Sequence, residues 1–129
     1  TFKVDVRFAT NEEYEEAKRI VKNVADMNYV KGCETEVSQI SMRTAMELNE
    51  KNTELLDSIN KIFIANGLSA LKIGERRGGS DASNVSSYGI PCIDSIGIGG
   101  ERAHSVEEYA ILSSLPESAK RISSIIMQL

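Results

Sequence analysis

His104 is the only histidine in the sequence, and it follows the glycine-rich stretch Gly97-Ile98-Gly99-Gly100. A neutral imidazole is a favoured zinc ligand, but a metal ion that activates water needs at least three converging protein ligands. His104 is therefore either an exposed loop residue or one ligand of a larger metal site. Glu107 and Glu108 follow closely enough for one of them to accept the second N–H of the imidazole; the alternative is that both are solvated charges.

A second group of residues with possible chemistry is the pair Arg76-Arg77, which Gly78-Gly79 follows directly. A guanidinium offers a planar fork to a carboxylate, and glycines let backbone amides approach the same anion. A helix that begins near Ser80 would add the positive end of its dipole. The pattern favours a site for one carboxylate, and solvated loop charges are the alternative.

The elements that would position these groups begin with a strand, helix, strand pattern over residues 1–44. Apolar and polar residues alternate over residues 2–8, which predicts a strand with one buried face. Thr10 and Glu13 have the spacing of a capping box, and the helix that follows has one apolar face. Gly32 breaks this helical pattern, and residues 35–40 read as a second strand.

The rest of the chain alternates helices with short apolar segments, which is typical of α/β organisation. Asn52 or Thr53 is expected to cap a helix that ends at Asn66-Gly67. Short strands are predicted at residues 71–73 and 90–96, and Ser80 or Asp81 is expected to cap a short helix between them. A last helix is expected to start at Ser114, with a proline in its first turn.

Composition narrows the class of protein. Of the 129 residues, 41% are hydrophobic and 26% are charged, as in a soluble globular domain that can bury a core. The net charge of −4 disfavours a nucleic-acid partner, because phosphate binding needs clustered lysine and arginine in excess. The apolar runs are too short to span a membrane, and no signal-peptide pattern is present. Cys33 and Cys92 lie far apart without metal-type spacing, which favours reduced thiols in a cytoplasmic protein.

Four motifs in order resemble the C-terminal part of an M20-family metallopeptidase, closest to the glutamate carboxypeptidase type. They are Arg76-Arg77-Gly78-Gly79-Ser80-Asp81-Ala82, Tyr88-Gly89-Ile90-Pro91, Gly97-x-Gly99-Gly100 and His104-Ser105-x-x-Glu108-Tyr109, followed by a closing helix. Upstream, Val4-Asp5-Val6-Arg7-Phe8 with its helix resembles the second half of the lid, or dimerisation, domain of that family. The resemblance spans essentially the whole chain.

The resemblance implies a two-zinc hydrolase of peptide or amide bonds, in which cobalt or manganese can replace zinc. His104 matches a zinc ligand of the family, and Glu108 would be its outer hydrogen-bond partner. Arg77, or Arg76 if the register differs by one residue, would hold the substrate carboxylate beside Gly78 and Gly79. Arg43 lies where some members carry a further substrate-contacting arginine.

The expected fold class is therefore α/β: the C-terminal portion of a zinc-peptidase catalytic domain, with a mixed or parallel sheet and helices. A β-α-β half of an α+β lid domain precedes it. The predicted boundaries are 1–46 for the lid half and 47–129 for the catalytic segment. The resemblance puts the other ligands and the general base in an N-terminal part of the same enzyme, so the chain by itself is expected to be inactive. It also implies a homodimer and a peptide or N-acyl amino-acid substrate. The alternative is a non-catalytic α/β binding module.

Overall fold

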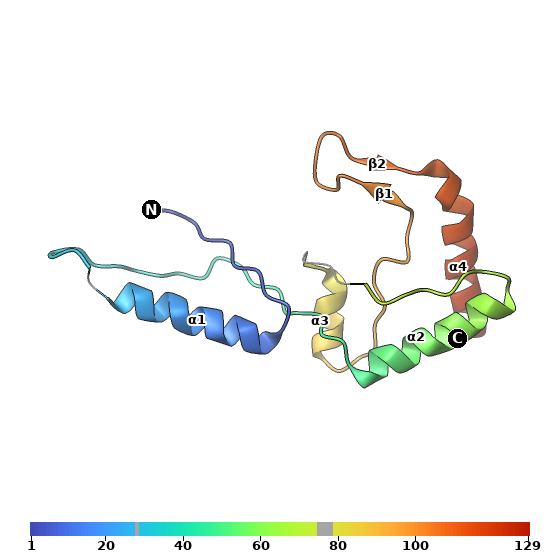
Figure 1. The fold of residues 1–129 in the computed structure, drawn as a ribbon, viewed down its shortest axis with the longest axis horizontal. Coiled ribbons are helices and arrows are strands. Elements are labelled where there is room, and N and C mark those ends of the chain that lie inside the picture. Colours follow the sequence, from blue (N-terminus) through green and yellow to red (C-terminus); the bar gives the residue numbers. More distant parts are fainter. Residues whose placement is uncertain (28, 75–78) are drawn as a thin grey trace. The chain divides into compact units, whose positions relative to one another are not determined.

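The computed structural model describes residues 1–27, 29–74 and 79–129, in two compact units. The first unit is Thr1–Glu47 with Glu75–Ile90, and the second is Leu48–Gly74 with Pro91–Leu129. Helices α1 (Asn11–Asp26) and α3 (Asp81–Ser87) belong to the first unit. The second unit holds helices α2 (Glu50–Ala65) and α4 (Leu115–Gln128), strands β1 (Gly100–Glu101) and β2 (Tyr109–Ala110), and a 3₁₀ turn at Leu112–Ser114 (Figure 1).

Helix α1 begins as the sequence predicts. The Oγ1 atom of Thr10 accepts a hydrogen bond from the Glu13 amide at 3.1 Å. The Glu13 carboxylate accepts in return from the amide of Ala9, at 2.7 Å, rather than from that of Thr10. Thr10 is thus confirmed as the helix cap, but the return bond of a capping box goes to the residue before the cap.

The extended segments on either side of α1 run along this helix without forming a sheet (Figure 1). The Phe8 and Tyr14 ring centroids are 5.0 Å apart, and the Tyr14 hydroxyl donates to Oε1 of Gln39 at 3.0 Å. The predicted strands at 2–8 and 35–40 are wrong as strands, because neither forms a hydrogen-bonded ladder within the described residues. Alternation of side chains selects an extended backbone, but a strand also requires a paired neighbour.

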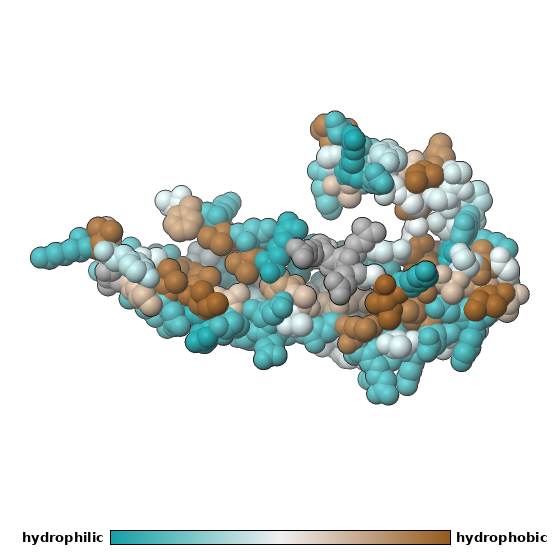
Figure 2. Space-filling view, in the orientation of Figure 1, coloured by the Kyte–Doolittle hydropathy of each residue, from teal (hydrophilic) through white to brown (hydrophobic). Residues whose placement is uncertain are grey.

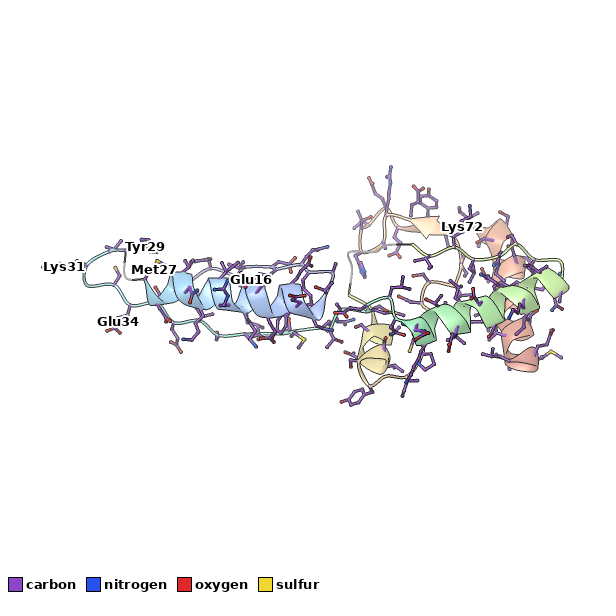
Figure 3. The ribbon with its side chains drawn as sticks, turned by 60° about the horizontal axis from the view of Figure 1, so that its bottom comes forward. Glu16, Met27, Tyr29, Lys31, Glu34 and Lys72 are labelled. Atoms are coloured by element: carbon purple, nitrogen blue, oxygen red, sulfur yellow. The ribbon has the colours of Figure 1, made fainter. Side chains whose placement is uncertain are left out.

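Figure 3 shows side chains at the far end of this unit, where the chain turns back after α1. Met27, Tyr29, Lys31 and Glu34 project around this turn, and the Tyr29 hydroxyl lies 3.0 Å from the Met27 sulfur. Cys33 is exposed in the same turn. None of the residues of α1 is buried, so this helix depends on its cap and its surface pairs more than on a core.

Helix α2 begins earlier than predicted. Its N-cap is Asn49, whose side chain accepts from the Asn52 amide at 2.9 Å, so the prediction of Asn52 or Thr53 as the cap is wrong. Asn52 is instead buried, and its Oδ1 accepts from the backbone amide of Cys92 at 2.9 Å. The predicted end at Asn66-Gly67 is confirmed, because Gly67 has φ +70°, a conformation that glycine tolerates best.

The predicted strands at 71–73 and 90–96 are not strands in this structure. The side chain of Asn60 binds both the amide and the carbonyl of Leu71, at 2.7 and 3.1 Å, as a neighbouring strand would. In the second segment, Cys92 makes the bond to Asn52 described above. Side-chain amides from α2 therefore satisfy backbone groups that a sheet partner would otherwise satisfy.

The apolar centre of the second unit lies where α2 packs against α4. Ile59 and Phe63 are 2% and 0% exposed, and the Arg121 guanidinium carbon lies 4.8 Å from the Phe63 ring centroid. Most other large apolar side chains are at least partly exposed, and Figure 2 shows many of them at the surface. No described helix has the length and hydrophobicity needed to traverse a lipid bilayer.

The predicted α/β class is thus observed only coarsely, as helices with a small sheet. Among the described residues that sheet is the antiparallel pair β1–β2, which the sequence did not predict, and no mixed or parallel sheet forms. Ser80 caps α3, as one of the two predicted alternatives, because its Oγ accepts from the Ala82 amide at 3.1 Å. The predicted start of the last helix is confirmed, because Ser114 is the N-cap residue of α4. Its hydroxyl makes no cap hydrogen bond and instead accepts from the Gly99 amide at 2.9 Å, which fastens the hairpin to the start of the helix.

Candidate functional site

His104 lies in the loop of the β1–β2 hairpin. The register pairs Gly100 with Ala110 and Glu101 with Tyr109, and the Ile111 amide donates to the Gly99 carbonyl at 2.7 Å. A Cβ atom at Gly100 would lie 2.4 Å from the Tyr109 carbonyl oxygen, so the strands approach as closely as they do only because this residue is glycine. The hairpin therefore presents residues 102–108 as a loop with fixed ends.

Hydrogen bonds within this loop hold its shape. The Ser105 hydroxyl donates to the Arg102 carbonyl at 2.8 Å and accepts from the Glu107 amide at 3.2 Å. The Arg102 guanidinium forms an ion pair with the Glu107 carboxylate across the loop. The Ser105 amide also donates to the Arg102 carbonyl, at 3.2 Å. The loop is thus closed on itself by both side chains and backbone.

His104 is exposed, and its backbone amide donates to the carboxylate of Glu108 at 3.3 Å. Glu108 was expected to accept from the imidazole, whereas the hydrogen bond observed here goes to the main chain of the same residue. The acidic side chain therefore restrains the backbone that carries the ring.

A metal ion would need more ligands than His104 provides. Over the described ranges 1–27, 29–74 and 79–129, no three His, Cys, Asp or Glu side chains gather closely enough to hold a metal ion. An exposed imidazole on an ordered loop suits the role of one ligand, but these residues by themselves do not form a metal centre.

The predicted substrate-binding residues fall in the first unit. Nη1 of Arg43 lies 3.0 Å from Oδ1 of Asp81, and a Cβ atom at Gly79 would lie 2.7 Å from Cδ of Arg43. The structure therefore brings together Arg43 and Gly79, which are 36 positions apart. Arg76, Arg77 and Gly78 lie outside the described residues.

The segment that carries Arg43 is fastened to α3. The Thr44 hydroxyl donates to the carbonyl of Ser83, at 3.1 Å, and Ser83 is 2% exposed. Arg43 itself keeps 55% of its side-chain surface exposed and Asp81 keeps 90%, so the pair lies open to solvent. A carboxylate from a ligand can reach this guanidinium without displacing any part of a core.

Sequence reasoning missed several of these roles. Ser80 or Asp81 was expected to cap α3; Ser80 provides the cap, and the pairing of Asp81 with Arg43 was not foreseen. Arg102 and Ser105 were not predicted to close the loop around His104. The signal in the sequence was the pair of opposite charges, Arg102 and Glu107, on either side of the histidine.

A comparison with protein families places these observations in context. The sequence profile described as Peptidase family M20/M25/M40 matches residues 2–128. The chain belongs to this peptidase family. The M20 resemblance that the ordered motifs suggested is thereby confirmed.

One similar curated protein is Carboxypeptidase G2 from Pseudomonas sp. (strain RS-16), to which this M20 chain is 29% identical over 131 residues. The match covers all of the chain and 31% of that relative, so the chain spans about a third of its length. No solved structure matches the chain significantly.

Proposed function

We propose that this chain is part of a metal-dependent peptidase that hydrolyses a peptide or amide bond next to a carboxylate of its substrate. His104 would supply one ligand to a pair of zinc ions, with cobalt or manganese as possible substitutes. The observation that carries the proposal is a single histidine, held at the tip of a closed hairpin loop, in a chain that matches a peptidase family over residues 2–128.

The metal pair, when bound, would supply an activated water molecule and stabilise developing negative charge. The remaining ligands and the general base would come from an N-terminal part of the same protein, since the described residues provide no ligand cluster. The task of this chain is then to hold the imidazole of His104 in place and to bind the end of the substrate.

Substrate binding is assigned to Arg43 and to Arg77 or Arg76, which precede α3 in the sequence. Arg43 would offer its guanidinium to the substrate carboxylate, beside Arg77 or Arg76 and the glycines Gly78 and Gly79. The Arg43–Asp81 pair supports this proposal, because a carboxylate already occupies the position that a substrate carboxylate would take. Asp81 would then keep the guanidinium extended until the substrate replaces it.

The name Carboxypeptidase G2 of the relative agrees with a substrate that carries a free carboxylate next to the bond that is cut. We further propose that the whole protein is a cytoplasmic homodimer. Its lid half would correspond to residues 1–46 and its catalytic segment to residues 47–129.

The ligand assignment is tested in the protein of natural length with His104→Ala. We expect the wild-type protein to bind about two zinc ions per subunit and the variant to lose both zinc and hydrolysis. Glu101→Gln, on the same hairpin, is the matched control and should keep both. Wild-type turnover in His104→Ala would show that the ligand assignment is wrong. If the wild-type protein binds the substrate without zinc and does not hydrolyse it, the non-catalytic module is favoured.

The substrate assignment is tested with Arg43→Ala and a pair of substrates that differ in a carboxylate or a carboxamide. Loss of a hydrogen bond to a charged group should lower kcat/KM roughly ten- to hundredfold for the carboxylate substrate alone. An equal loss for both substrates would contradict a role in carboxylate recognition.

The chain by itself should not hydrolyse a dipeptide, even with added zinc, because it lacks most of the ligands. Turnover that a chelator abolishes would contradict this expectation.

A further inference from the structure

The loop that carries His104 has an unusual backbone. Arg102 has φ +59° and His104 has φ +66°, so two residues with side chains adopt the left-handed conformation within three positions. The described chain has one other non-glycine residue at positive φ, Ser95. Such conformations are uncommon for L-residues and persist only where the surroundings fix them. The loop therefore contains interactions that outweigh the backbone preference of both residues.

Those interactions start from a residue beside the histidine. The Ser105 hydroxyl bridges the loop, since it donates to the Arg102 carbonyl and accepts from the Glu107 amide. The ion pair between Arg102 and Glu107 joins the same two positions through their side chains. Two independent links thus close the loop on both sides of His104.

We propose that Ser105 and the Arg102–Glu107 ion pair are positioning residues, which hold the backbone of His104 left-handed so that its imidazole is ready to bind metal. This inference rests on the proposed function, in which His104 is a metal ligand. It gives Ser105, Arg102 and Glu107 a role that follows neither from the family match nor from the presence of His104.

The physical basis is the ordering of an exposed ligand. His104 is exposed, and no core packing of the ring holds it in place. A flexible loop would have to be ordered each time the metal binds, and this would weaken affinity. Removal of an outer partner that orients a metal ligand typically lowers metal affinity about 10- to 100-fold.

The test compares zinc affinities in the protein of natural length, measured by competition with a chromogenic chelator. Ser105→Ala should lower zinc affinity about 10- to 100-fold. Glu107→Gln should lower it about two- to fivefold, because its ion pair with Arg102 is exposed and worth at most about 1 kcal/mol. Ser105→Thr, which keeps the hydroxyl, and Glu101→Gln, on the neighbouring strand, should stay within about twofold of the wild type. Excess zinc should restore turnover to Ser105→Ala, because this variant keeps all its ligands, but not to His104→Ala.

The outcomes separate this inference from the proposed function. If His104→Ala does not change zinc affinity, the ligand assignment itself fails. If His104→Ala loses zinc while Ser105→Ala and Glu107→Gln keep wild-type affinity, the ligand stands and the positioning role is overturned.

A measurement on the wild-type chain guards against variants that fail to fold. The three-bond coupling between the amide and α protons of His104, together with a strong intraresidue nuclear Overhauser effect between them, reports a left-handed backbone directly. We expect these signals in the wild-type chain and their loss in Ser105→Ala. An extended or right-handed His104 in the wild type would overturn the proposal whatever the variants do.

Discussion

Replacement of Gly100 by alanine should open the hairpin without unfolding the helices. The new Cβ atom would lie 2.4 Å from the Tyr109 carbonyl oxygen, 1.0 Å closer than the 3.4 Å at which ordinary contacts begin. The obstacle is backbone of the partner strand, so no side-chain rotation relieves it. The Cα atom of Ala110 would also lie within 3.3 Å, so the two strands must move apart.

The expected cost follows from this geometry. Overpacking typically costs about 1–3 kcal/mol, and the rigid partner puts this contact toward the upper end. Alanine recovers about 0.4–1 kcal/mol because it restricts the unfolded chain. If the hairpin is destabilised locally by about 1–3 kcal/mol, the amides that exchange when it opens should exchange about 5- to 150-fold faster.

The assay is amide hydrogen exchange followed by NMR. The reporter is the Ile111 amide, which binds the Gly99 carbonyl at 2.7 Å, and the amides of α2 serve as an internal reference. Gly97→Ala is the matched control, because nothing lies within 4 Å of a Cβ atom there and its φ is ordinary. Equal exchange of Ile111 in Gly100→Ala, Gly97→Ala and the wild type would refute the argument.

Three further predictions concern the first unit. Gly79→Ala should displace the Arg43 side chain, whose Cδ lies 2.7 Å from the new Cβ. The free energy of unfolding, measured in urea, should nevertheless fall by less than about 1 kcal/mol, because the Arg43–Asp81 ion pair is exposed. A larger loss would show that this ion pair supports the fold. Thr10→Ala should destabilise α1 by about 1 kcal/mol, seen as faster amide exchange in its first turn, and unchanged exchange would rule out the cap. The hydrogen bond from Arg19 holds the pKa of Glu16 below its usual 4.5. The stabilisation of the folded state by this bond is therefore present above pH 4.5 and is lost as the pH falls through the lowered pKa. The helicity of α1, followed by circular dichroism during acid titration, should fall less steeply in Glu16→Gln, and identical titrations would contradict this.

Local signals predicted the helices well. Thr10 and Ser80 cap helices where the sequence indicated, and Gly67 ends α2, because a cap depends on a few neighbouring residues. Asn52 misled the prediction because its side chain binds Cys92, 40 positions away, which no local pattern reveals. Ser114 precedes α4 as predicted, but the bond from the Gly99 amide to its hydroxyl, across 15 positions, was equally beyond any local pattern.

Pairing was not predictable from alternation. The apolar pattern at residues 2–8 specifies which side chains share a face but not which neighbour completes the ladder. The β1–β2 hairpin was missed because two-residue strands show no periodicity and its seven-residue loop has no simple turn motif.

The candidate site was likewise predictable where short motifs mark it and not where it depends on long-range contacts. The order of short motifs predicted the family and directed attention to His104 and Gly79, and the position of Arg43 within the resemblance added that residue. The contact between Arg43 and Gly79 joins positions far apart in the sequence, so only the folded chain reveals it. The bonds of Ser105 depend on backbone angles that no residue type specifies by itself.

The two cysteines have a practical consequence. Cys33 lies in the first unit and is exposed, Cys92 lies in the second and is partly covered, and neither forms a disulfide. A maleimide should therefore react at Cys33 first, and a second label can follow at Cys92 under mild denaturation. A donor and an acceptor dye, or two nitroxides, attached in this order would act as a molecular ruler between the units without any engineered thiol.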